Sequence, residues 1–224
     1  MTKVRAVLFD VHGTLVYSEE DVTETEISDI LFSRGYEVSP QQIRASWFFV
    51  SFIDYPKYGY SNWHSFFSRI FWRLKVKADK ETINRIVKLL ESKPYQLYPD
   101  ALEAVPKAKK NGFKTSTVTT IAKFKFIKAL KPIEKYFDFI MTGYEAGCDK
   151  TNPKMYRRTL EILDVKPEET VMIGDSPEID VSLPKKLGVR AVLLDRERKI
   201  AKYTQADAIV NDLNEAVETI IRKL

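Results

Sequence analysis

The chain has 224 residues, of which 44% are hydrophobic and 30% are charged, so we expect a globular protein with a sizeable core rather than a disordered chain. Its 36 Lys and Arg residues only slightly exceed its 31 Asp and Glu residues and are spread along the sequence, which argues against a nucleic-acid-binding protein. The single cysteine, Cys148, excludes an internal disulfide and a cysteine-based zinc site, and no apolar run approaches the roughly 20 residues of a membrane span.

The first predicted element is a buried strand over residues 4–9, which runs into the turn Asp10-Val11-His12-Gly13-Thr14. Such a strand end holds Asp10 at the carboxyl edge of a sheet, where α/β proteins place their chemistry. Because the chain reaches this strand at once, we expect no signal peptide, no membrane contact and a cytoplasmic location.

Helical spacing of apolar residues characterises the next part of the chain, from about residue 18 to residue 93. One helix is predicted over residues 24–32, and another begins at Ser39-Pro40, which suits an N-cap followed by the first helical position. A further helix ends before Pro94. No β alternation interrupts this block, so we expect a helical insertion after the first strand.

The insertion is rich in aromatic residues, and residues 47–72 hold 12 of the 27 in the chain. Most of them are expected to pack a small helical core, because aromatic side chains bury large areas. Residues 55–60 differ, since Pro56 and Gly59 favour a loop. An exposed aromatic residue on that loop, such as Tyr58, would suit a substrate or partner surface.

Strands return after about residue 98 and alternate with helices. The predicted strands are residues 114–119, 137–142, 170–174, 190–194 and 208–210, and the predicted helices include 100–111, 153–163 and 214–223. Such alternation implies a parallel sheet with helices on both faces. The predicted fold class is therefore α/β, a doubly wound, Rossmann-like sheet formed by residues 1–16 and 97–224, with an α-helical cap domain over residues 17–96.

Four predicted strand ends or loops carry reactive side chains. In chain order they hold Asp10 with Thr14, Thr119 with Thr120, Lys150, and Asp175 with Asp180. Carboxylates crowded at one sheet edge are costly unless a cation lies between them, and Mg²⁺ suits oxygen ligands. Simpler interpretations stay open: Lys150 as an ordinary loop lysine, Thr120 as the cap of a helix from Ile121, and Asp180 as a helix N-terminal residue.

These four segments, in this order, resemble the four motifs of the haloacid dehalogenase superfamily of hydrolases, which also places a helical cap between its first two motifs. The resemblance implies that Asp10 is a nucleophile that forms a covalent aspartyl intermediate. It implies that Lys150 is a fixed positive charge, and that Thr119 and Thr120 bind the transferred group. The hydroxyl of Thr14 is expected to orient the turn that carries Asp10.

The resemblance also implies a cofactor. In the phosphatases of this superfamily Mg²⁺ binds at the acidic motifs, so the ion is expected on Asp10, on the backbone carbonyl of His12 and on Asp175. Asp180 is the further carboxylate expected at this metal site.

His12 departs from the pattern of the phosphatases, which normally carry a second aspartate there as a general acid and base. Members of the superfamily that break carbon–halogen bonds also lack this aspartate, because a halide leaves without a proton. Asp175 favours a phosphatase, since those dehalogenases lack this Gly-Asp and work without a metal. Two roles stay open for His12: its imidazole supplies the acid–base work, or only its carbonyl takes part.

Two cap segments suggest how a substrate is chosen. Residues 52–59 resemble the REG-2-like branch of the superfamily, whose members often lack the second aspartate but keep the acidic fourth motif. A cap arginine holds the substrate carboxylate in the dehalogenases, and Arg44 is the nearest candidate for that role. Tyr58 is a second candidate for contact with the substrate.

The sequence therefore predicts a hydrolase, first of all a Mg²⁺-dependent phosphatase that acts on a small, anionic, phosphorylated metabolite. One alternative is a metal-independent 2-haloacid dehalogenase. Another is a binding or regulatory protein on a weakened scaffold of this family, with the aromatic cap segment as its partner surface. The chain is expected to be a monomer or a homodimer.

Overall fold

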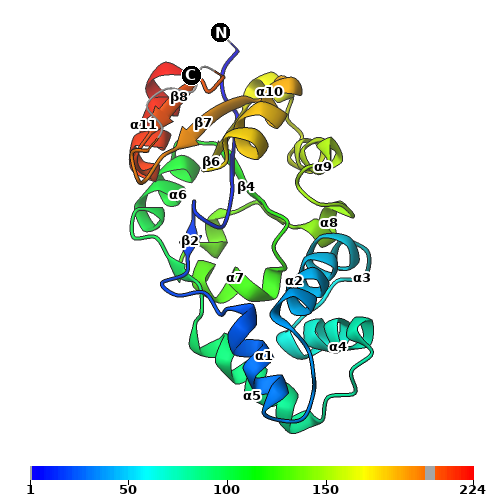
Figure 1. The fold of residues 1–224 in the computed structure, drawn as a ribbon. Coiled ribbons are helices and arrows are strands. Elements are labelled where there is room, and N and C mark those ends of the chain that lie inside the picture. The colour runs from blue at the N-terminus through cyan, green and yellow to red at the C-terminus, as the bar shows by residue number, and fades with distance from the viewer. Residues whose placement is uncertain (1, 200–204) are drawn as a thin grey trace.

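A six-stranded parallel sheet forms one part of the computed structural model, which describes residues 2–199 and 205–224 (Figure 1). Its strand order is β5-β4-β1-β6-β7-β8. The bounds are β1 Ala6–Phe9, β4 Lys114–Val118, β5 Phe139–Met141, β6 Thr170–Gly174, β7 Arg190–Leu194 and β8 Ala208–Val210. The chain runs outward from β1 to β5, returns to the centre at β6 and then runs the other way. The predicted doubly wound α/β fold is confirmed.

Helices cover both faces of the sheet, and β1 shows why. Val7 and Phe9 pack against α6, α7 and α11 on one face, whereas Ala6 and Leu8 pack against α9 on the other. Successive side chains of a strand point to opposite faces, so a strand buried on both needs an unbroken apolar run. The bounds of the covering helices are α6 Ala101–Lys110, α7 Lys123–Leu130, α8 Gly143–Ala146, α9 Pro153–Leu163, α10 Leu183–Lys186 and α11 Leu213–Lys223.

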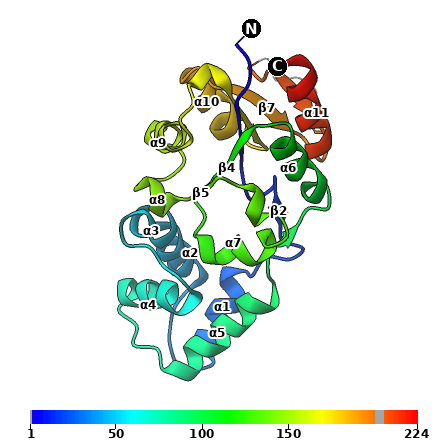
Figure 2. The same ribbon diagram turned by 180° about the vertical axis from the view of Figure 1, so that it is seen from behind.

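The predicted helical block lies at the opposite end of the molecule from most of the sheet (Figures 1 and 2). It consists of α1 Glu24–Phe32, α2 Pro40–Phe49, α3 Tyr55–Tyr58, α4 Trp63–Leu74 and α5 Lys80–Ser92. The block has its own core, in which Ile43, Phe66 and Ile86 are fully buried. Capping boxes at Thr23 and Ser39 begin its first two helices, the second of them as predicted from Ser39-Pro40.

A short ribbon joins the block to the rest of the chain. Its strands, β2 Val16–Tyr17 and β3 Gln96–Leu97, pair in antiparallel fashion. A second link runs through α3, where the Tyr55 hydroxyl hydrogen bonds the Thr142 hydroxyl at 2.8 Å. The predicted boundaries, 16/17 and 96/97, fall within the ribbon, and the division into core and cap domains stays a prediction.

The loop expected over residues 55–60 is helical at Tyr55–Tyr58, and a π-helical turn, Val50–Asp54, joins it to α2. Pro56 directly follows the π-helical turn, in which the Tyr55 N–H donates to the Val50 carbonyl, so the helical backbone continues through a residue that has no N–H to donate. Gly59 then ends the helix with a φ of +64°. The local turn signals thus misled because a π-helical turn accommodates the proline within a helical run and the glycine suits the end of that run. None of the helices in the described ranges is long and apolar enough to cross a membrane.

Candidate active site

The ends of three neighbouring strands bring together three of the four predicted segments. Strand β1 pairs in register with β4 on one side and with β6 on the other. Asp10 follows β1 directly, Thr119 follows β4, and Asp175 follows β6. Because the carboxyl ends of parallel strands face the same edge, all three residues lie at one edge of the sheet.

Lys150 completes this group from the loop before α9. Its ammonium forms ion pairs with the carboxylates of Asp10 and Asp180, the second at 2.5 Å. Only 8% of Asp10, 6% of Lys150 and 1% of Asp180 is exposed. The backbone N–H of Lys150 donates to the Thr120 hydroxyl at 2.9 Å. The interpretation of Lys150 as an ordinary loop lysine is therefore wrong.

Burial and charge shift the pKa values of this group in opposite directions. Burial raises the pKa of the Asp10 carboxyl, and the neighbouring Lys150 ammonium only partly offsets the effect. Burial likewise raises the pKa of Asp180, to about 6. Burial alone would lower the pKa of Lys150, but the two carboxylates outweigh it and raise that pKa above its usual range. The lysine therefore provides a permanent positive charge beside Asp10.

Three carboxylates form the candidate metal site. Asp10, Asp175 and Asp180 each place an oxygen within 4.8 Å of the others. Asp175 is exposed to solvent on one side, but partial desolvation of its carboxyl and the charge of Asp180 raise its pKa. A hard divalent cation takes such oxygen ligands and would offset the repulsion among them. The residues present thus fit the predicted Mg²⁺ ion.

Two glycines let these carboxylates approach the backbone. Gly13 has a φ of +79°, and a Cβ atom there would lie 2.2 Å from an Asp175 carboxylate oxygen. A Cβ atom on Gly174 would lie 2.2 Å from Cγ of Asp180. Any larger residue at either position would push a carboxylate out of the group.

The turn after Asp10 is held by an arginine that the sequence did not point to. Arg196, just beyond β7, donates to the Thr14 carbonyl at 2.7 Å and to the Gly13 carbonyl at 3.3 Å. Its guanidinium also pairs with Asp100 at 2.8 Å and lies 3.7 Å from the Tyr98 ring centre. The Thr14 hydroxyl is buried and forms no hydrogen bond with the described residues, and the expectation that it orients the turn stays a prediction. Arg196 therefore binds backbone carbonyls, which every residue has.

The two threonines after β4 have different roles. The Thr119 hydroxyl accepts the backbone N–H of Ile121 at 3.2 Å. The Thr120 hydroxyl accepts from Lys150, as described above, and α7 begins only at Lys123, with Ala122 at its N-cap position. The interpretation of Thr120 as a helix cap is therefore wrong: it fixes the loop that carries Lys150.

His12 is exposed beside this group. Its ring meets the ring of Tyr95 edge-on, with 5.4 Å between the ring centres. The turn is closed by the Val11 carbonyl and the Gly13 N–H, which both bond to Val16, so the His12 carbonyl takes no part in closing it. Its role as a metal ligand stays a prediction.

Arg44 and Tyr58, the predicted cap contacts to substrate, lie elsewhere. The Arg44 side chain is 81% exposed and lies 3.8 Å from Glu24. Tyr58 is 63% exposed and its ring lies against the Arg69 guanidinium. Among the described residues neither one contacts the group around Asp10, and substrate binding by either stays a prediction.

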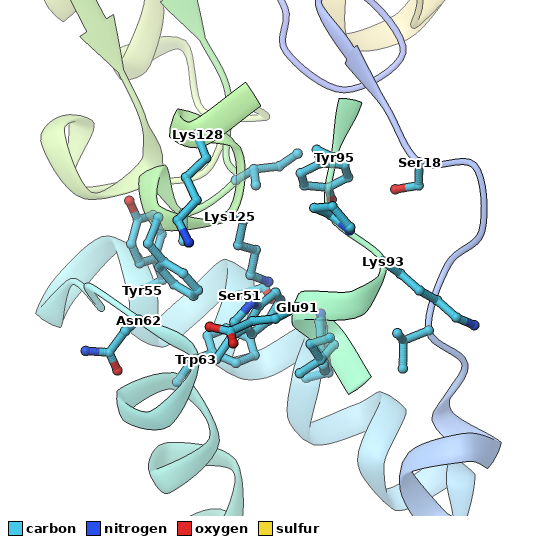
Figure 3. A pocket seen from close by; sticks show the side chains of 18 of the residues that line it. Ser18, Ser51, Tyr55, Asn62, Trp63, Glu91, Lys93, Tyr95, Lys125 and Lys128 are labelled. Carbon is cyan, nitrogen blue, oxygen red and sulfur yellow. The ribbon is translucent and has the colours of Figure 1, made fainter. Parts of the chain in front are cut away.

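A cavity of about 410 Å³ opens between the helical block and the sheet domain (Figure 3). Thr120, whose hydroxyl holds Lys150, is one of its lining residues, and so is Tyr95, whose ring meets His12. The cavity therefore adjoins the acidic site. Apolar atoms form most of its wall, and the aromatic and aliphatic side chains that α2, α4, α5 and α7 contribute to it were indicated by the sequence only as core.

Comparison with known proteins agrees with the family resemblance seen in the sequence. The family model of haloacid dehalogenase-like hydrolases matches residues 4–188. The pyrophosphatase PpaX of Bacillus mycoides is 27% identical over 98% of each chain. A HAD phosphatase from Thermococcus onnurineus, solved as a crystal structure, is 25% identical to this chain in sequence. Its TM-score is 0.67 over 97% of this chain and 98% of that one.

A solved 2-haloacid dehalogenase from Pseudomonas syringae has a TM-score of 0.71 over 99% of this chain and 100% of that one, but at 16% identity it shows the fold alone. The family match spans all four segments that converge at the sheet edge. The chain therefore belongs to the haloacid dehalogenase-like hydrolases.

Proposed function

We propose that the chain is a Mg²⁺-dependent phosphatase that hydrolyses a small phosphorylated metabolite through an aspartyl intermediate on Asp10. The observation that carries the proposal is the carboxylate of Asp175, which extends the buried Asp10–Asp180 pair to a three-carboxylate site. The similarity to a pyrophosphatase over the whole chain, and to a solved phosphatase, supports it. The REG-2-like branch, the cytoplasmic location and a monomeric or homodimeric state stay predictions.

Each residue of the site has its own role in the proposed phosphoryl transfer. A carboxylate oxygen of Asp10 attacks phosphorus, the bond to the leaving oxygen breaks, and water then cleaves the aspartyl phosphate. The Lys150 ammonium offsets charge on Asp10 and on the transferred group, and the Thr119 hydroxyl lies at the same strand edge to bind its oxygens. Mg²⁺, held by Asp10, Asp175 and Asp180, would supply further neutralisation of phosphoryl oxygens.

We assign proton transfer to the His12 imidazole, which is exposed beside the site and close enough to interact electrostatically with the Asp175 carboxyl. His12→Ala should lower kcat/KM for phenyl phosphate by about 10²-fold or more, because general acid–base catalysis typically contributes that much. The loss should be smaller for p-nitrophenyl phosphate, whose leaving group departs without a proton. His12→Asp should raise phosphatase activity.

The other histidine of the chain supplies the control. His64 hydrogen bonds Asn84 at 2.9 Å on the surface of the helical block, so His64→Ala should leave both rates unchanged. Equal rates for His12→Ala and the wild type on phenyl phosphate would remove any acid–base role and leave only the backbone of His12 at the site.

Dehalogenation is the second candidate, because His12 stands where a phosphatase normally has an aspartate. Release of phosphate from p-nitrophenyl phosphate and of chloride from 2-chloropropionate should each be measured with Mg²⁺ and with EDTA. We expect phosphate release that stops in EDTA and returns when Mg²⁺ is restored, because three carboxylates without a cation repel the substrate.

The same assays separate the alternatives. Chloride release that persists in EDTA would reject the phosphatase in favour of the dehalogenase. No turnover of either compound, nor of a broad panel of phosphate esters, would favour a binding or regulatory protein.

A further inference from the structure

Lys125 occupies an unusual position in the cavity beside the active site. It extends from α7 into the cavity, opposite residues of the helical block (Figure 3). Its ammonium lies over three aromatic rings, 4.6 Å from the ring centre of Trp47, 4.9 Å from Trp63 and 4.1 Å from Phe66. Cation–π contacts of this kind offset part of the cost of taking a charge out of water.

No carboxylate neutralises this ammonium. Within residues 2–199 and 205–224 the Lys125 ammonium forms no ion pair or hydrogen bond. The two acidic residues that line the cavity, Asp21 and Glu91, are exposed and neither pairs with it. Burial without a counter-ion lowers the pKa of Lys125 to about 7. An anion beside it would therefore be bound favourably, and would restore the charged form.

The cavity is placed to hold the part of a substrate that does not react. One side is formed by Thr120 and Ile121, directly after the strand end that carries Thr119. Tyr95 forms another side and contacts His12. A phosphate group at Asp10 would therefore leave the rest of its molecule beside this opening, whose wall is mostly apolar and includes the rings of Trp47, Trp63 and Phe66.

We propose that Lys125 binds a carboxylate on the organic part of the substrate, which is an aromatic or branched apolar phosphomonoester. The inference rests on the proposed phosphatase function and names the substrate class of that site. A carboxylate matches the one lysine charge that lies among the rings. The other two lysines that line the cavity differ from Lys125, since Lys93 pairs with Glu26 at 3.0 Å and Lys128 is exposed, so a second phosphate dianion beside Lys125 would leave one charge unpaired. The aromatic wall suits an apolar body between the two anionic groups.

Matched substrates measure this recognition. They are phenyl phosphate and three relatives that carry a carboxylate directly on the ring, through one methylene or through two methylenes at the para position. Wild-type enzyme should prefer at least one carboxylated ester over phenyl phosphate. Lys125→Met should lower kcat/KM for that ester by about tenfold or more, because charge-assisted hydrogen bonds contribute that much. Its kcat/KM for phenyl phosphate should stay within about twofold, and Lys125→Arg should retain part of the preference.

The control is Lys123→Met, which removes an exposed lysine two residues earlier on the same helix and should change neither rate. Melting temperatures test a purely structural role for Lys125. Methionine keeps an unbranched chain against the rings without a buried charge, so Lys125→Met should melt at or above the wild-type Tm. A fall in Tm together with equal losses on all four esters would overturn the proposal and make Lys125 a structural residue.

Direct binding separates this inference from the proposed function. Calorimetric titration with 4-hydroxybenzoate, 4-hydroxyphenylacetate and 3-(4-hydroxyphenyl)propionate, the products of the three carboxylated esters, needs no turnover. If phosphate esters are not hydrolysed but one of these acids binds wild type and not Lys125→Met, the inference stands and the phosphatase fails. If esters are hydrolysed with no preference for any carboxylate, and the acids bind both proteins alike or not at all, the phosphatase stands and the role of Lys125 is refuted.

Discussion

Replacing Asp10 with asparagine is expected to reduce phosphate release by about 10⁴-fold or more, the loss typical of an enzyme deprived of its nucleophile. The amide oxygen of asparagine is neutral and cannot form the aspartyl phosphate. The change also removes one carboxylate of the candidate metal site and one of the two partners of Lys150. The measurement is kcat for p-nitrophenyl phosphate at saturating Mg²⁺.

Asp29→Asn supplies the control, since Asp29 is exposed on α1 in the helical block and should leave the rate unchanged. Borohydride reduction during turnover gives an independent check, because it should convert the phosphorylated Asp10 to homoserine in wild type only. An Asp10→Asn protein that keeps more than about a hundredth of the wild-type rate would contradict a nucleophilic role for this carboxylate.

Lys150→Met should have the second largest effect, and it should change both activity and stability. Loss of a fixed charge that stabilises the reacting group typically costs about 10²–10³ in kcat. Removal of the ammonium also leaves the buried carboxylates of Asp10 and Asp180 facing each other, and breaking a buried ion pair typically costs about 3–5 kcal/mol. Urea unfolding should therefore show a lower free energy of unfolding for the variant.

Unfolding measured with added Mg²⁺ gives a further test of the role of Lys150. A cation bound among the three carboxylates replaces part of the lost positive charge, so the stability deficit of Lys150→Met should shrink when Mg²⁺ is added. Lys154 is exposed in the first turn of α9, four residues after Lys150, and Lys154→Met should match the wild type in rate and stability. If Lys150→Met were as stable and active as Lys154→Met, Lys150 would have no part in catalysis or in stabilising the buried carboxylates.

Secondary structure was predicted best where the sequence pattern suited only one type of element. The strands over residues 170–174, 190–194 and 208–210 have their predicted bounds, because short apolar runs between turn residues suit a strand buried on both faces. The helix over residues 24–32 is also found as predicted, since its apolar spacing and its cap agree. The loop predicted over residues 55–60 was wrong because a π-helical turn accommodates Pro56 within a helical run and Gly59 suits its end, and packing of α3 against α8 and Thr142 favours the helix.

Prediction of the candidate site was limited in the same way, because some of its contacts arise only from tertiary packing. Asp10, Thr119, Lys150 and Asp175 could be selected from sequence because each follows a strand or opens a loop where chemistry is placed. Arg196 could not, since its partners are the carbonyls of Gly13 and Thr14, which carry no sequence signal. Lys125 could not either: a lysine among other lysines on a helix looks like a solvated face, and only the approach of α2 and α4 surrounds it with rings.

The sequence by itself determined the α/β class, the helical insertion and the candidate reactive residues, because these depend on periodicity and on side-chain chemistry along the chain. Only the tertiary structure decided that Lys150 lies between two carboxylates, that Thr120 holds it there, and that Lys125 faces a cavity without a counter-ion. Burial and charge partners come from segments far apart in the chain, and no local pattern encodes which of them will meet.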